Sequence, residues 1–176
     1  MGSGMSSSIV DESMWASLPS WDMPAFLGAY TLHDSHLVSV EILPWIGALV
    51  SIQWDLHWNR VVPSDHESLV IRFSTPYSVR WTQGAWHQST LSGAKSEPIS
   101  TSGREAMLES GEFDPRAYQG KRSDIEAPMF DGSLTRTVFE LMNWSALTIV
   151  HSERVQLACL DKNGNNWQVA QANKAT

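Results

Sequence analysis

Two polar segments of the chain carry the side chains that could do chemistry together. Imidazole, carboxylate and hydroxyl groups in one cluster can bind a divalent metal ion, or they can form a Ser-His-Asp hydrolytic set. The two segments supply His33, Asp34, Ser35, His36, Asp55 and His57. Whether these side chains meet depends on how the residues between the segments fold.

The stretch between the two segments has the pattern of a β-hairpin. Leu37–Leu43 and Ala48–Asp55 both alternate apolar and polar residues, and Pro44–Gly47 separates them as a turn. The side chains that we expect to face inward are Val38, Val40, Ile42, Val50, Ile52 and Trp54.

The register of this hairpin decides which polar side chains share a face. Because opposed residues of an antiparallel pair lie on the same face, the compact registers place Ser35 opposite either Asp55 or His57. Without a bulge, both registers gather one group on the polar face: His33, Ser35, Asp55 and His57. Asp34 and His36 then fall on the apolar side, where buried polar groups need hydrogen-bond partners.

A metal site is one interpretation of this cluster. Zinc needs three or four nitrogen, oxygen or sulfur ligands, yet the hairpin parity separates His36 from His33 and His57. We favour the alternative that these histidines hydrogen-bond carboxylates and strand-end backbone, with Asp34 capping a turn. No metal and no cofactor is therefore predicted, and the chain has no glycine-rich phosphate loop or dinucleotide fingerprint.

A hydrolytic set of Ser35, His57 and Asp55 is a second interpretation. The serine lacks the Gly-x-Ser-x-Gly surroundings of a nucleophile elbow. Pairs of Asp and His are also frequent as plain cross-strand contacts. No catalytic residue is therefore assigned.

Tryptophan is unusually abundant, with nine in 176 residues. Tryptophan that remains at a surface favours interfaces and ligand stacking. The candidate aromatic binding surface consists of Trp45, Trp54, Trp58, Trp81 and Trp86. A tryptophan-rich core is the competing explanation, and we expect it to account for at least half of these residues.

Alternation along the rest of the chain predicts about seven or eight strands in all, with short helices. The later strands are expected at Leu69–Phe73, Val79–Trp81, Thr135–Met142, Ala146–His151, Arg154–Leu160 and Trp167–Ala170. Asn163-Gly164 is a strong hairpin signal before the last of them. The predicted fold class is mainly β (α+β), a consecutive antiparallel meander that is strongly curved or closed into a barrel or sandwich.

The length favours a single domain. We expect residues 1–8 to be a disordered N-terminus that includes an expression remnant, and residues 9–172 to form the domain. Residues 87–132 are rich in Ser, Gly, Pro and charge, which predicts a long polar insertion. Such an insertion can serve as a lid, a binding arm or a dimer-exchange arm, or it can be a tolerated surface loop.

Charge and composition exclude several classes of function. The net charge is −7 and no cluster of Lys and Arg stands out, so a nucleic-acid partner is not expected. No apolar run approaches the length of a membrane helix, and no signal peptide is recognised, so no membrane role is expected. The single cysteine, Cys159, is predicted to be a buried hydrophobe, and its solitude fits a cytoplasmic location.

The segment Leu32–Val40 resembles a recurring opening of small bacterial β-rich proteins, many of them toxin-immunity and other accessory proteins. The resemblance is carried by His33-Asp34-Ser35 ahead of an alternating strand. It implies a small non-enzymatic binding protein from a bacterial accessory gene, and it transfers no catalytic role.

The leading hypothesis from the sequence is a non-enzymatic, immunity-like interaction protein that binds a protein partner or a small ligand and forms a homodimer. The alternative is a small-ligand-binding barrel or a metal-assisted hydrolase whose site lies at the His33/His57 end of the hairpin.

Overall fold

The computed structural model describes residues 12–43, 47–74, 76–82, 89–100, 102–103, 106, 134–152 and 154–169. Sheet A contains β1 (Ser20–Asp22), β2 (His36–Leu43), β3 (Gly47–Gln53), β4 (Ser68–Phe73), β9 (Arg154–Leu160) and β10 (Asn166–Trp167). Sheet B contains β5 (Pro76–Thr82), β6 (Leu91–Pro98), β7 (Leu134–Leu141) and β8 (Ala146–Ser152). The helices are α1 (Glu12–Ser17) and α2 (Met23–Ala29).

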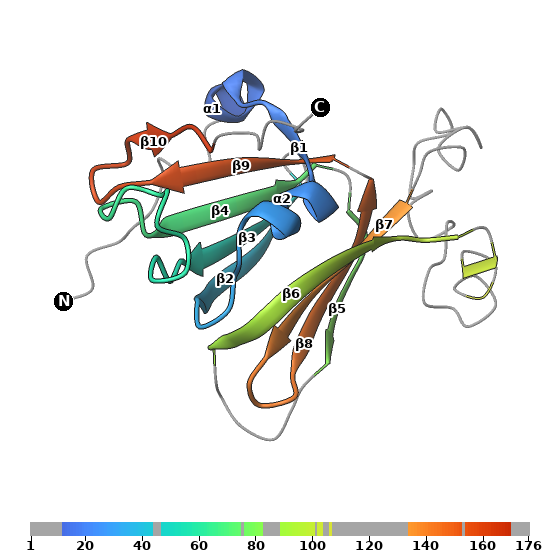
Figure 1. The fold of residues 1–176 in the computed structure, drawn as a ribbon. Helices are drawn as coiled ribbons and strands as arrows, with labels where there is room; N and C mark the ends of the chain where they lie inside the picture. The colour runs from blue at the N-terminus through green and yellow to red at the C-terminus, as the bar shows by residue number, and fades with distance from the viewer. Residues whose placement is uncertain are drawn as a thin grey trace, which may run out of the picture.

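Both sheets are antiparallel, which confirms the mainly β prediction, but the meander is wrong. Sheet A runs β1-β9-β4-β3-β2, with β10 beside β9, and sheet B runs β5-β8-β7-β6. The C-terminal strand β9 therefore lies between two N-terminal strands (Figure 1). Local alternation carries no information about such long-range pairing. Neither sheet closes into a barrel.

Sheet A is covered on both faces. On one face the central strands join side chains of sheet B and α2 in one hydrophobic cluster, which includes Ile52, Phe73, Phe139 and Ile149. On the other face a smaller cluster packs around Trp15 of α1. This double burial explains why β4 is apolar at successive positions, since only a strand covered on both sides has two apolar faces.

Between its turn and a β-bulge, the first hairpin has one of the two predicted registers, the one that would place Ser35 opposite Asp55. Near the turn Val40 lies opposite Val50, but the register shifts between Leu37 and Ser39. A bulge adds one residue to one strand and exchanges the faces of the residues beyond it. The predicted inward positions are wrong for Val38, which lies at the bulge, and for Ile42, which keeps its predicted register beside the turn but belongs to an edge strand. They are 65% and 64% exposed.

Gly47 shows why this hairpin needs glycine at the start of β3. Its φ is +103°, and a Cβ atom there would lie 2.1 Å from the Phe73 carbonyl oxygen. The other predicted turn residues, 44–46, lie outside the described residues.

The predicted polar insertion is wrong at its beginning. Leu91–Pro98 forms β6, an edge strand that pairs with β7 along its length. Most of the predicted insertion beyond it, like residues 1–8, lies outside the described residues. The Asn163-Gly164 turn is confirmed, because Asn166 of β10 pairs with Leu160 of β9. Among the described residues, no helix is long and apolar enough to cross a membrane.

Candidate functional site

The turn that carries His33, Asp34 and Ser35 joins the two sheets. The Ser35 amide donates to the Leu32 carbonyl oxygen at 3.2 Å, which closes a four-residue turn. Asp34 sits in it at φ +63°, a conformation that Asp tolerates better than most residues. The Asp34 amide donates to the carbonyl oxygen of Leu91 in β6, and the Leu91 amide donates to the carbonyl oxygen of Ser35. Sheet B thus holds the turn beside the end of sheet A.

A buried asparagine ties this turn to the loop that follows β3. The Asn59 amide nitrogen donates to the carbonyls of Thr31 (2.8 Å) and Asp55 (3.0 Å), and its side-chain oxygen accepts from the Thr31 amide. The indole of Trp54 donates to the same Thr31 carbonyl at 2.9 Å. Buried polar groups that are fully paired make a loop rigid. Residues 54–62 therefore form a fixed platform.

Ser35 and Asp55 meet as predicted, but in a structural contact. Ser35 is buried, and its hydroxyl oxygen accepts the Asp55 backbone amide at 3.0 Å. The Asp55 carboxylate accepts the backbone amide of His57 at 2.7 Å, so it caps the loop and does not orient the imidazole. The bulge places His36 outward, contrary to prediction, and its ring contacts the Thr90 hydroxyl at 3.2 Å. These contacts do not assemble a hydrolytic set.

Four other side chains form a cluster at the surface. The Asp34 carboxylate oxygen Oδ2 accepts the Trp58 indole N–H at 3.3 Å and lies 2.9 Å from His33 Nδ1. The Trp58 ring contacts the His57 ring edge-on at 4.9 Å and the His33 ring at 6.5 Å between centroids. Trp58 is nevertheless 58% exposed. The arrangement fixes the direction of an indole whose surface remains open to solvent.

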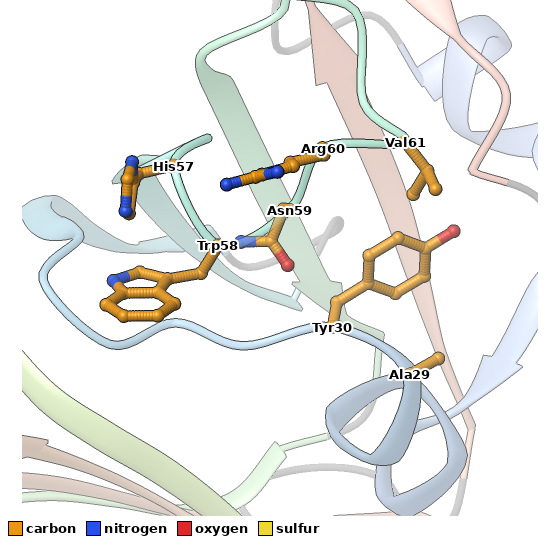
Figure 2. Close-up of a pocket in the computed structure, with 7 residues that line it drawn as sticks. All are labelled: Ala29, Tyr30, His57, Trp58, Asn59, Arg60 and Val61. Carbon is orange, nitrogen blue, oxygen red and sulfur yellow. The ribbon is translucent and has the colours of Figure 1, made fainter.

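A recess of about 440 Å³ adjoins this cluster (Figure 2). Its lining residues are Ala29, Tyr30, His57, Trp58, Asn59, Arg60 and Val61. The Arg60 side chain extends toward His57 and Trp58, and the Tyr30 ring stands at the other end (Figure 2). Burial, and secondarily the Cys159 thiol, raises the pKa of Tyr30, so its phenol stays neutral. The recess offers aromatic faces and one guanidinium.

The predicted aromatic surface does not form as a unit. Trp54 is 2% exposed and packs against Phe26 and Tyr30, so its assignment to the surface is wrong. Its place on the predicted inward face of the strand Ala48–Asp55 already indicated the core. Trp81 lies half-exposed at the end of β5 in sheet B. Trp45 and Trp86 lie outside the described residues.

Sequence reasoning missed the residues that complete the site. Asn59 and Tyr30 act through contacts with residues distant in the sequence, and Arg60 was overlooked within its own loop. A signal was nevertheless present: Trp58-Asn59-Arg60 places an aromatic, an amide and a guanidinium within one loop.

The geometry of the described residues supports neither a metal site nor a reactive thiol. Among the residues that the structure describes, no three His, Cys, Asp or Glu side chains are grouped so as to hold a metal ion. Cys159 is buried, its thiol donates to the His66 carbonyl at 3.3 Å, and burial raises the pKa of Cys159 to about 12. A thiol that does not ionise near neutral pH is a poor nucleophile.

Comparison of the chain with protein-family models, with curated proteins and with solved structures yields no match. The case for function therefore depends on the geometry of this site.

Proposed function

We propose that the protein is a non-enzymatic binding protein. Its recognition surface comprises His33, His57, Trp58 and Arg60, and we call it the Trp58 surface. The observation that carries the proposal is that the Trp58 indole is largely exposed and yet held by Asp34 and by two imidazole rings.

A fixed, exposed indole is suited to binding for two physical reasons. Tryptophan and arginine are enriched among the residues that contribute most to protein interfaces. Ordering a mobile side chain on binding costs about 0.5–1.5 kcal/mol, and a side chain that is already held avoids much of that cost. The Asn59 hydrogen bonds hold the loop backbone in the same way, so that ordering the backbone on binding also costs little free energy.

We propose a protein as the partner. The resemblance of His33-Asp34-Ser35 to the opening of immunity-like accessory proteins supports this choice, because the same three residues form the turn beside Trp58. A small planar ligand is the second candidate. The observation that favours it is the recess between Tyr30 and Trp58, whose volume falls within the roughly 300–1,000 Å³ of small-molecule sites.

The test for a protein partner compares three immobilised baits in extracts of the source cells. They are the wild-type chain, Trp58→Ala and Trp144→Ala, which removes an exposed tryptophan from the turn between β7 and β8. We expect one protein to be retained by the wild type and by Trp144→Ala and to be lost with Trp58→Ala. Equal retention by all three baits would refute the assignment of the Trp58 surface.

The test for a small ligand uses a library of planar aromatic carboxylates, since the recess contains indole and guanidinium groups. Binding is followed by the chemical shifts of the indole N–H signals. Ligands of the recess are expected to shift the Trp58 signal and leave that of Trp144 in place.

Two wider assignments accompany this proposal. A cytoplasmic location is supported by a single cysteine that is buried and forms no disulfide. A two-layer sandwich is supported by the hydrophobic cluster that both sheets share.

A further inference from the structure

The edge strands of the two sheets differ in how they are protected from pairing with another chain. Free edges attract other strands, and proteins block them with short strands, charges, prolines and bulges. β1 has three residues. β5 starts at Pro76, has a bulge and exposes Arg80. β6 has a bulge, exposes Lys95 and Glu97, and ends at Pro98.

β2 is less protected beyond its beginning, because its bulge lies between Leu37 and Ser39 and it contains no proline. Its first residues are covered, because His36 bridges Thr90 and the Leu37 amide donates to the Ser89 carbonyl at 2.8 Å. Beyond Leu37, no strand in the described part of the chain pairs with its outer edge (Figure 1). The free part exposes Val38 and Ile42 and contains one charged residue, Glu41.

We infer that two copies of the chain pair through the outer edges of β2, antiparallel and centred on Val40. A two-fold axis at Val40 places Val40 opposite its counterpart in the partner copy, on the face that β2 shares with the core. The same register brings Val38 of each copy next to Ile42 of the other. The exposed apolar side chains of β2 then cover one another.

The side chains on the opposite face of β2 favour this register. Centring on Val40 places Ser39 of each copy opposite Glu41 of the other, and a serine hydroxyl can donate to a carboxylate. The hydroxyl of Ser39 already lies 3.4 Å from Glu41 Oε1 within one copy. Centring on Glu41 would set two carboxylates directly opposite, which is destabilising. Complementarity therefore favours a second copy as the occupant, and the two six-stranded sheets become continuous.

Analytical ultracentrifugation of the full chain over a concentration series into the high micromolar range tests the pairing. The wild type is expected to sediment as a dimer, and Val38→Lys/Ile42→Lys as a monomer with an unchanged circular dichroism spectrum. Met142→Lys, at an exposed apolar residue in the turn after β7, is the matched control and should remain dimeric. A monomeric wild type, or a dimer that survives the double substitution, would overturn the inference.

Oxidative cross-linking tests the register separately. Val40→Cys is expected to form a disulfide-linked dimer, because the two Cα atoms of a directly opposed pair lie about 4.5–5.5 Å apart. Native Cys159 is buried and does not compete. Glu41→Cys is the comparison, and it should cross-link less. Stronger cross-linking at position 41 would reject centring on Val40. Neither experiment depends on the Trp58 surface, so the two proposals stand or fall independently.

Discussion

Two tryptophans at the ends of the two sheets are both exposed, but they are held very differently. Trp58, after β3, is 58% exposed, donates to Asp34 and contacts two imidazole rings. Trp144, in the turn between β7 and β8, is 91% exposed. Among the described residues no hydrogen bond or ring contact reaches its indole, and the turn is closed by backbone groups and the Asn143 side chain.

The contrast shows that exposure alone does not define a binding surface. The loop around Trp58 contains a buried asparagine that bonds three backbone groups, and such a network is costly to form unless every member is paired. Trp144 stands at φ +69°, an unfavourable conformation for a bulky residue, and its side chain gains no compensating contact there. The central distinction is therefore between a side chain fixed by its surroundings and one that is merely exposed.

The largest effect is expected from removing the asparagine that fixes the Trp58 loop. Asn59→Ala leaves the Thr31 amide and the Asp55 carbonyl without their partner in a buried site, which should lower the free energy of unfolding by about 2–4 kcal/mol. Urea denaturation measures the change. Asn163→Ala, in the exposed turn before β10, is the control and should change stability by less than about 0.5 kcal/mol. Equal effects of the two substitutions would contradict the role of Asn59.

The next largest effect should be a gain in stability at Trp144. The left-handed conformation costs a non-glycine residue about 1–2 kcal/mol, and glycine does not incur that cost. Trp144→Gly is expected to be more stable than Trp144→Ala by about 1 kcal/mol, in the same denaturation experiment. The alanine variant keeps the strained φ and loses the same indole, so their difference isolates the backbone. A glycine variant that is no more stable than the alanine variant would show that the turn is unstrained.

The reactivity of Cys159 reports on opening of the Trp58 loop. Because burial raises the pKa of Cys159 to about 12, thiol labelling of the folded protein should be slow at pH 8. The thiol contacts the His66 carbonyl, in the connection that follows the loop, so Asn59→Ala should accelerate labelling while Trp144→Gly should not.

The same pKa predicts a pH dependence. The unfolded thiol ionises at its ordinary pKa and the folded thiol does not, so the unfolded state binds fewer protons at high pH. Stability should therefore be full below that ordinary pKa and should fall as the pH rises above it. A Cys159→Ala variant that shows an identical loss would assign the dependence to other groups.

The smallest effect is expected at Asp34. Asp34→Gly preserves the left-handed backbone and removes the acceptor of the Trp58 indole, so stability should fall by less than about 1 kcal/mol. The indole N–H resonance of Trp58 should nevertheless move and exchange faster with solvent. The Trp144 resonance in the same spectrum is the internal control, and a shift common to both would point to a global change.

The sequence predicted the local elements of this fold because alternation and turn residues are local signals. The strands around Val50 and Phe139 and the Asn163-Gly164 turn are examples. It could not predict that β9 pairs with β4, since nothing local records which distant strand is the neighbour.

The candidate site was predicted in part. The two polar segments do lie together, and Asp55 contacts Ser35. A single bulge between Leu37 and Ser39 reversed the faces, which buried Ser35 and exposed His36. Bulges leave little trace in an alternating sequence, and the role of Asn59 appears only when the turn and the loop are placed side by side.

The most direct test of the central distinction is ¹⁵N relaxation of the indole N–H groups in the free protein. If Trp58 is held in one orientation, its indole order parameter should match the rigid backbone at about 0.85, and that of Trp144 should fall below about 0.6. Equally low values for both would contradict the account, because Trp58 would then be no better prepared for binding than any other exposed tryptophan.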